Sequence, residues 1–203
     1  MSELKQDPYN LIITGVGGQG NVLASRLVGD ILAGEGFNVT IGETFGASQR
    51  GGSVMSHLRA TRGEGLSPQI PLGQAHMVVS LEPAEAIRVL AAYGNPRTKV
   101  ISNMRPVMPV SVVSGQRRYP FREELMEHLK RLSARAWFLD TTELALELGN
   151  PIFSNVILVG ALAKSGELPI SREGFERVIR QRFPADKAPP NLKAFDLGRE
   201  MLV

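Results

Sequence analysis

A glycine-rich turn is the first feature of this sequence that could take part in ligand binding. Gly15, Gly17 and Gly20 follow the spacing G-x-G-x-x-G, with Gly18 and Gln19 between the last two. In that pattern the glycines allow a tight turn, let the backbone approach a pyrophosphate and permit close packing of a helix on a strand. The N-terminus of the helix that follows attracts anions. The turn is therefore a candidate site for a phosphate-bearing ligand.

A dinucleotide site of this kind also needs an acidic residue at the end of the next strand, where it binds a ribose. Glu43 is the candidate, because it follows Gly20 by about the 20 residues that such sites show. A site for NAD or FAD is thus one interpretation of the segment. The other is a tight turn that serves packing and binds no nucleotide, and Gln19 together with the extra glycine at position 18 favours it.

A second loop combines a fixed positive charge with paired glycines. Ser48, Gln49 and Arg50 come directly before Gly51 and Gly52, at the start of a predicted strand. Such glycines can adopt positive φ or lie very close to another surface, and the fork of donors on an arginine suits a carboxylate or a phosphate. Taken alone, the loop also fits an ordinary flexible loop with a solvated arginine. Together, the two loops are predicted to face a ligand or a partner protein.

These loops belong to a predicted alternation of strands and helices. The period of 3.6 residues that starts at Asn21 predicts a helix that ends at Gly34 and Gly36. A further helix is expected to start at Pro83, and Asp140 is expected to cap the helix after it. The remaining elements are predicted strands over 10–16, 37–43, 53–61, 77–81, 99–103 and 135–139 and helices over 121–132, 151–164 and 171–182, with irregular structure over 104–120 and 184–191.

The order of these elements predicts the fold class. A strand, a turn, a helix and a second strand indicate parallel strands with a right-handed crossover. Continued alternation predicts an α/β, Rossmann-like layered sandwich with a mostly parallel central sheet and helices on both faces. No repeat, low-complexity tract or linker divides the chain, so residues 1–203 are expected to form a single domain.

The two glycine loops together resemble the gamma-type domain of the 2-oxoacid:ferredoxin oxidoreductases. The first carries Gly-Val-Gly-Gly-Gln-Gly and the second Gln-Arg-Gly-Gly-Ser-Val-Met-Ser-His, a form most like that of the small (beta) subunit of the indolepyruvate enzymes. Further similarity lies at Asn155, at Gly160-Ala161-Leu162, and at Asn191 with the run from Ala194 to Gly198. The resemblance covers residues 9–198 and is weakest over 104–118.

This resemblance implies a reaction that is shared between chains. Thiamine diphosphate with magnesium, held in a large partner subunit, attacks the keto carbon of an aryl pyruvate, and carbon dioxide leaves. Two electrons pass through iron–sulfur clusters to ferredoxin, and coenzyme A takes the acyl group. The resemblance assigns no catalytic residue to this chain. It leaves open whether the glycine loops contact coenzyme A, a nucleotide or only the partner subunit.

Composition agrees with such a division of labour. The chain has 203 residues and no cysteine, so it cannot ligate an iron–sulfur cluster through thiolates or form a disulfide. Its three histidines lack metal-ligand spacing, and no Gly-Asp-Gly motif of the thiamine type is present. A net charge of +3 and few aromatic residues do not favour nucleic-acid binding.

Apolar segments are too short to span a membrane, and the first residues do not resemble a signal peptide, so a cytoplasmic location is expected. The isolated chain is compatible with a homodimer. Two other functions stay open at this point. One is a nucleotide-binding Rossmann protein, either an NAD-dependent oxidoreductase or a regulatory module. The other is a homologous subunit recruited as a stand-alone assembly protein.

Overall fold

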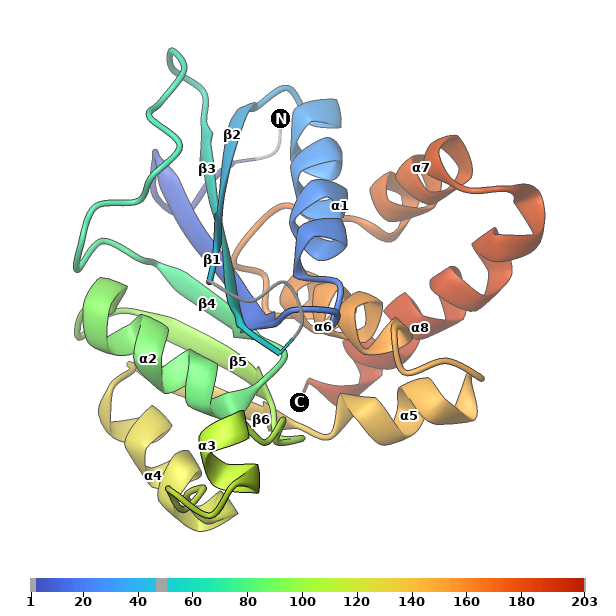
Figure 1. Ribbon diagram of the computed structural model, residues 1–203. Coiled ribbons are helices and arrows are strands. Elements are labelled where there is room, and N and C mark those ends of the chain that lie inside the picture. The colour runs from blue at the N-terminus through green and yellow to red at the C-terminus, as the bar shows by residue number, and fades with distance from the viewer. Residues whose placement is uncertain (1–2, 47–50, 203) are drawn as a thin grey trace.

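The computed structural model (Figure 1) describes residues 3–46 and 51–202, which contain six strands and eight α-helices. The strands are β1 (Tyr9–Val16), β2 (Asn38–Phe45), β3 (Ser53–Thr61), β4 (Met77–Ser80), β5 (Lys99–Asn103) and β6 (Arg135–Leu139). The helices are α1 (Asn21–Gly34), α2 (Pro83–Tyr93), α3 (Val110–Val113), α4 (Arg122–Arg131), α5 (Thr141–Glu147), α6 (Phe153–Lys164), α7 (Arg172–Arg182) and α8 (Ala188–Met201), with a short 3-10 turn at Ala185–Lys187 before α8.

The strands form one mixed sheet in the order β2-β3-β1-β4-β5-β6. β1, β4, β5 and β6 pair in parallel, whereas β3 is antiparallel to both of its neighbours. The predicted α/β class with a mostly parallel sheet is therefore confirmed. β1 and β2 run in the same direction, as the strand–helix–strand pattern predicts, but β3 lies between them. Their pattern alone did not reveal this insertion.

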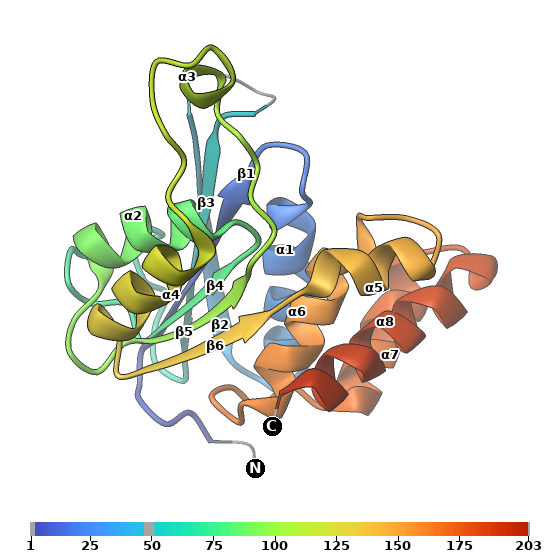
Figure 2. The same ribbon diagram turned by 90° about the horizontal axis from the view of Figure 1, so that it is seen from below.

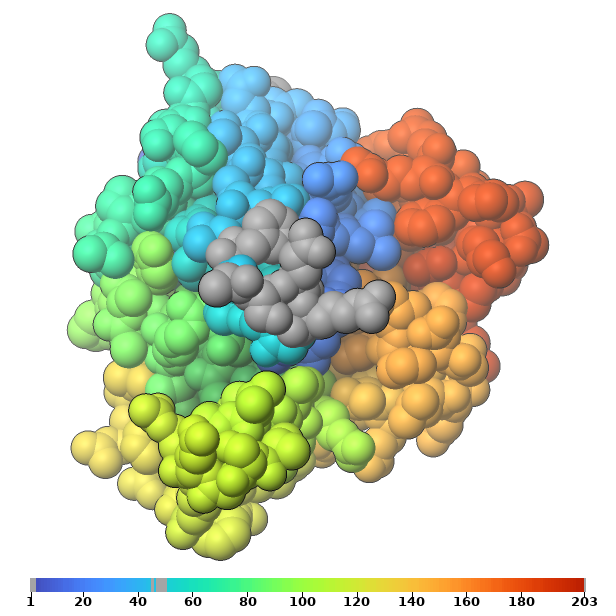
Figure 3. All heavy atoms as spheres, in the orientation of Figure 1, coloured from blue at the N-terminus to red at the C-terminus, as the bar shows by residue number. Residues whose placement is uncertain are grey.

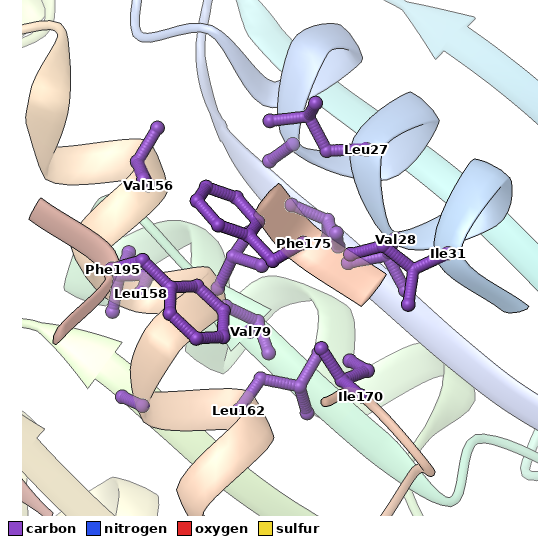
Figure 4. Close-up of a cluster of buried hydrophobic side chains, with 14 of the residues drawn as sticks. Leu27, Val28, Ile31, Val79, Val156, Leu158, Leu162, Ile170, Phe175 and Phe195 are labelled. Carbon is purple, nitrogen blue, oxygen red and sulfur yellow. The ribbon is translucent and has the colours of Figure 1, made fainter. Parts of the chain in front are cut away.

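Side chains alternate between the two faces of the sheet and divide the core into two layers. Leu11 and Ile13 on β1 face α1, α6, α7 and α8, whereas Ile12 faces α2 and α4. Helices thus cover both faces (Figure 2). Figure 4 shows the larger layer, in which Phe175 of α7 lies between side chains of α1 and Phe195 of α8. The two phenyl rings stack with their centroids 4.1 Å apart.

The packing of α6 against α8 completes this layer, and α8 lies where the sequence predicted an irregular tail. Residues 184–191 were expected to be irregular because of their prolines, but α8 begins at Ala188. Pro189 and Pro190 occupy its first turn, where a missing backbone N–H breaks no helical hydrogen bond. Gly160 of α6 and Gly198 of α8 let the two backbones touch, since a Cβ at either position would overlap a carbonyl oxygen of the other helix.

The N-termini of α7 and α5 are capped differently, and a cap by Asp140 was predicted for α5. Ser171 caps α7 by accepting a hydrogen bond from the N–H of Gly174 (2.9 Å). Asp140 precedes α5 but makes no side-chain capping hydrogen bond, so that prediction was wrong. Its carboxylate is taken instead by Arg122, which donates two hydrogen bonds of 2.7 Å. Among the described helices, none is long and apolar enough to cross a membrane.

Candidate functional site

The glycine-rich turn lies at the carboxyl end of β1 and is held closed by one of its own side chains. Gln19 Oε1 accepts a hydrogen bond from the N–H of Val16 (2.7 Å), and Gln19 Nε2 donates to the carbonyl of Leu81, just after β4 (3.2 Å). A Cβ added at Gly15 would lie 2.6 Å from Gln19 Oε1. The side chains of Gln19 and Asn21 and the Cβ of Leu81 thus occupy the space that a side chain at Gly15 would need.

The last glycine of the pattern makes room for α6. Gly20 has a φ of 85°, and a Cβ there would overlap Nδ2 of Asn155, which donates to the Gly20 carbonyl (3.3 Å). Gly18, with a φ of 100°, is different, because a Cβ at this position would meet no described atom within 4 Å. Gly20 thus serves packing between α1 and α6, while Gly18 faces open space.

Two cavities adjoin at Gly18 and Ile152. The larger has a volume of about 690 Å³ and is lined by Gly17, Gly18, Gly20, Asn21, Val22, Gly46, Val54 and Ile152. The smaller has a volume of about 320 Å³, and its walls include Gly18, Gln19, Leu81, Arg105, Val107 and Ile152. Both volumes lie within the range of small-molecule sites, roughly 300–1,000 Å³. The turn therefore borders enough space for a ligand or for an inserted segment of a partner.

The groups around these cavities favour a polar or anionic occupant. α1 begins at Asn21 with no acidic residue in its first turn, and Gly20 offers no side-chain cap, so the first N–H groups of the helix leave a partial positive charge. Arg105 lines the smaller cavity, and no acidic residue is among the described residues that line either one. Asn21 is buried, and its Oδ1 has no hydrogen-bond partner among the described residues.

Glu43, the candidate ribose ligand, lies apart from this space. It pairs with Ser56 across the β2–β3 ladder, and its carboxylate is 3.5 Å from a guanidinium nitrogen of Arg26 on α1. Because β3 separates β2 from β1, Glu43 is two strand spacings from β1, or about 10 Å. It does not line either cavity. The geometry that a dinucleotide site requires of Glu43 is therefore not formed.

The second glycine loop is joined to the first. Ser48, Gln49 and Arg50 lie outside the described residues. Gly51 has a φ of 75°, and the carbonyl of Gly52 accepts a hydrogen bond from the N–H of Gly17 (2.8 Å). Both conformational uses expected for the paired glycines, positive φ and a close backbone contact, are thus present. The structure brings Gly51 and Gly52 to the same edge of the sheet as the turn.

The buried carboxylate of Glu82, just after β4, holds Val107 in the wall of the smaller cavity. Glu82 Oε2 accepts from the N–H of Glu85 (2.8 Å) and caps α2, while Oε1 accepts from the Tyr119 hydroxyl and from the N–H of Val107 (3.4 Å). Burial raises the pKa of the Glu82 carboxyl, and these hydrogen bonds partly offset the rise. Burial, followed by the hydrogen bond to Glu82, raises the pKa of Tyr119. Tyr119 was missed in the sequence, because its only signal there was an aromatic residue within a proline-rich segment.

Comparison with known proteins settles the family. A family model described as pyruvate ferredoxin/flavodoxin oxidoreductase matches residues 10–201. The chain belongs to this family. It is 39% identical over 200 residues to the indolepyruvate oxidoreductase subunit IorB of Pyrococcus horikoshii, a match that covers 96% of this chain and 98% of that protein. It is 28% identical over 196 residues to the 2-oxoglutarate synthase subunit KorC of Archaeoglobus fulgidus, covering 95% of this chain and 87% of that one.

Solved structures share the fold of this family member. The pyruvate oxidoreductase subunit PORC of Thermotoga maritima aligns with a TM-score of 0.71 at 18% identity, over 97% of both chains. The 2-oxoglutarate:ferredoxin oxidoreductase of Magnetococcus marinus aligns with a TM-score of 0.73 at 18% identity, over 97% of this chain and 31% of that one. In the second protein the same fold is thus one part of a longer chain. The predicted family and fold are confirmed, and the chain is a small subunit of the 2-oxoacid:ferredoxin oxidoreductase type.

Proposed function

We propose that the chain is the non-catalytic small subunit of an oxidoreductase that acts on indolepyruvate or a related aryl pyruvate. The observation that carries the proposal is the identity of 39% to an indolepyruvate oxidoreductase subunit over 96% of this chain, compared with 28% for a 2-oxoglutarate synthase subunit. In this role it supports the oxidative decarboxylation that a large partner subunit carries out. Coenzyme A is the acyl acceptor, and ferredoxin receives the electrons through the assembled enzyme.

The residues of this chain do not fit the redox cofactors of that reaction. It has no cysteine for an iron–sulfur cluster. Within the described residues, no group of three or more His, Cys, Asp or Glu side chains is placed to hold a metal ion, such as the magnesium that accompanies thiamine diphosphate. The large subunit therefore supplies both groups.

The contribution of this chain lies in the space beside the glycine turn. A polar or anionic group suits this space. The two cavities adjoin there, the first turn of α1 has no acidic residue, and Arg105 adds a guanidinium. In the assembled enzyme, this group would be a phosphorylated part of coenzyme A or an acidic segment of the large subunit. The runner-up, an NAD-dependent protein, would need an acidic ribose ligand, and Glu43 is directed to Arg26 instead.

Co-expression with the large subunit tests the proposal. The two chains should purify together, and the complex should reduce a viologen dye with indolepyruvate and coenzyme A. The isolated small subunit should not reduce the dye, and it should contain no iron or thiamine. Oxidation of indolepyruvate by the isolated chain would refute the assignment of roles.

Thermal denaturation separates this proposal from the runner-up. A ligand that binds only the native state stabilises it by about 2.7 kcal/mol at 100 times its dissociation constant. Because the proposed function includes no dinucleotide site, NAD, NADP and FAD should not bind and should leave the melting temperature of the chain unchanged. A clear rise with NAD would favour the nucleotide-binding protein.

A further inference from the structure

Residues 104–120, here called the arm, leave the carboxyl edge of the sheet after β5 and return to α4. Figure 2 shows α3 at the far end of the arm, beyond the edge of the sheet, and Figure 3 shows the same segment on the surface that faces the viewer. α3 buries none of its residues. Val110 and Val113 are 84% and 76% exposed, and Met108 is 48% exposed. The tip of the arm therefore presents apolar side chains to solvent.

The base of the arm is fixed, so this exposure is a built feature of the fold. Met104 is buried, and its N–H donates to the carbonyl of Leu139 at the end of β6 (2.8 Å). At the other end, the Tyr119 hydroxyl donates to the buried carboxylate of Glu82, which also accepts from the N–H of Val107. One carboxylate thus holds both ends of the arm. Apolar side chains on an anchored protrusion are typical of a protein–protein contact.

The charge of the arm indicates what covers it. Residues 104–120 contain three arginines and no aspartate or glutamate. Arg118 pairs with Glu124 (2.8 Å). Arg105 and Arg117 are exposed, and neither guanidinium has an ion-pair partner among the described residues. An apolar tip between unpaired cations is complementary to an apolar groove with acidic edges. Two copies of this arm would instead place like charges together.

We propose that the arm docks the large subunit, with Val110 and Val113 in an apolar groove and Arg105 and Arg117 against carboxylates at its rim. The proposal rests on the proposed function, since it needs that partner. Arg105 and Val107, at the base of the arm, also line the smaller cavity beside Gln19. A large subunit seated on the tip would therefore cover the mouth of the space beside the glycine turn.

The test is co-purification of the complex with variants of the arm. Val110→Asp/Val113→Asp should lower the recovered large subunit at least tenfold, while the melting temperature of the small subunit stays unchanged because both side chains are exposed. Leu72→Asp is the matched control, since Leu72 is 72% exposed in the loop between β3 and β4. It should assemble as the wild type does. Arg105→Ala/Arg117→Ala should weaken assembly and reduce its dependence on salt.

Each other outcome overturns a defined part of the proposal. Full assembly of Val110→Asp/Val113→Asp would show that the arm is not the contact, and the proposed function would stand. Failure of the wild-type chain to assemble would refute the proposed function itself. If the wild-type chain forms homodimers in sedimentation and Val110→Asp/Val113→Asp does not, the tip binds a second copy and the proposal is overturned. If the wild-type chain binds anionic phospholipid vesicles and the variant does not, the tip binds a membrane surface, which also overturns the proposal.

Discussion

The contact between α6 and α8 gives a prediction about stability that depends on two glycines. A Cβ at Gly198 would overlap the carbonyl oxygen of Ile157 and lie 2.7 Å from its carbon and 3.0 Å from the Ala161 nitrogen. All three atoms are backbone atoms of α6, so no side chain can turn aside to relieve the overlap. Gly198→Ala must therefore push the two helices apart by roughly 1 Å, which weakens the dispersion contacts of the side chains between them.

The expected cost follows from two opposing effects. Overpacking of a core costs about 1–3 kcal/mol, and a clash between two backbones belongs at the upper end of that range. Replacement of glycine by alanine within a helix returns about 0.5–1 kcal/mol. The net loss of unfolding free energy is therefore about 2 kcal/mol. For a domain of this size, 1 kcal/mol corresponds to about 2–4 °C, so the melting temperature should fall by about 4–8 °C.

Thermal and urea denaturation followed by circular dichroism measure this loss. Gly65→Ala is the control, because a Cβ at Gly65 would meet no described atom within 4 Å and its φ is not positive. It should be neutral or slightly stabilising. Gly160→Ala should resemble Gly198→Ala, since its Cβ would overlap the carbonyl of Phe195. One separation relieves both clashes, so the double variant should cost less than the sum. A Gly198→Ala protein as stable as the wild type would refute the described packing.

Two further predictions concern protonation and the second loop. Burial lowers the pKa of His57 and His76, and each accepts a backbone N–H through Nδ1 (from Ile70 at 3.3 Å and from Asn10 at 2.9 Å), so the unfolded chain binds more protons and stability should fall from pH 7.5 to 5.5. This fall should shrink in His57→Phe and persist in a variant of the exposed His128; an unchanged slope in His57→Phe would contradict it. From sequence alone, Arg50→Ala should change stability by no more than about 0.5 kcal/mol but weaken assembly or turnover, with partial rescue by Arg50→Lys. Full assembly and activity of Arg50→Ala would show that this arginine has no role at the interface.

Local patterns predicted most of the elements because they carry strong periodicity. β5 and β6 have the predicted bounds, and α1 begins at Asn21 as its apolar period indicates. The insertion of β3 between β1 and β2 was not predictable in this way. Strand order depends on pairing between distant segments, and an apolar run has the same appearance beside either neighbour. α8 was missed because its prolines resemble a terminator, although the first turn of a helix accepts them.

The candidate site shows the same limit at the level of single side chains. The spacing located the turn, and the family resemblance located the second loop, but the hydrogen bond that joins Gly17 to Gly52 spans 35 residues of sequence and has no local signature. The contact of Tyr119 with Glu82 spans 37 residues and likewise has no local signature in the sequence. Sequence reasoning therefore found the strand-end positions where polar groups gather, but not which of them contact one another.

The glycine spacing of the turn arises here from requirements other than those of a dinucleotide site. In the nucleotide fingerprint, the second glycine admits the pyrophosphate and the third lets the helix pack on the strand. In this chain, Gly15 makes room for Gln19, Gly20 makes room for Asn155 of α6, and Gly18 lines both cavities. Gln19 and Asn155 are therefore as much a part of the motif as the glycines. Their hydrogen bonds to the turn and its flanks explain how the spacing can persist without an acidic ribose ligand on the adjacent strand.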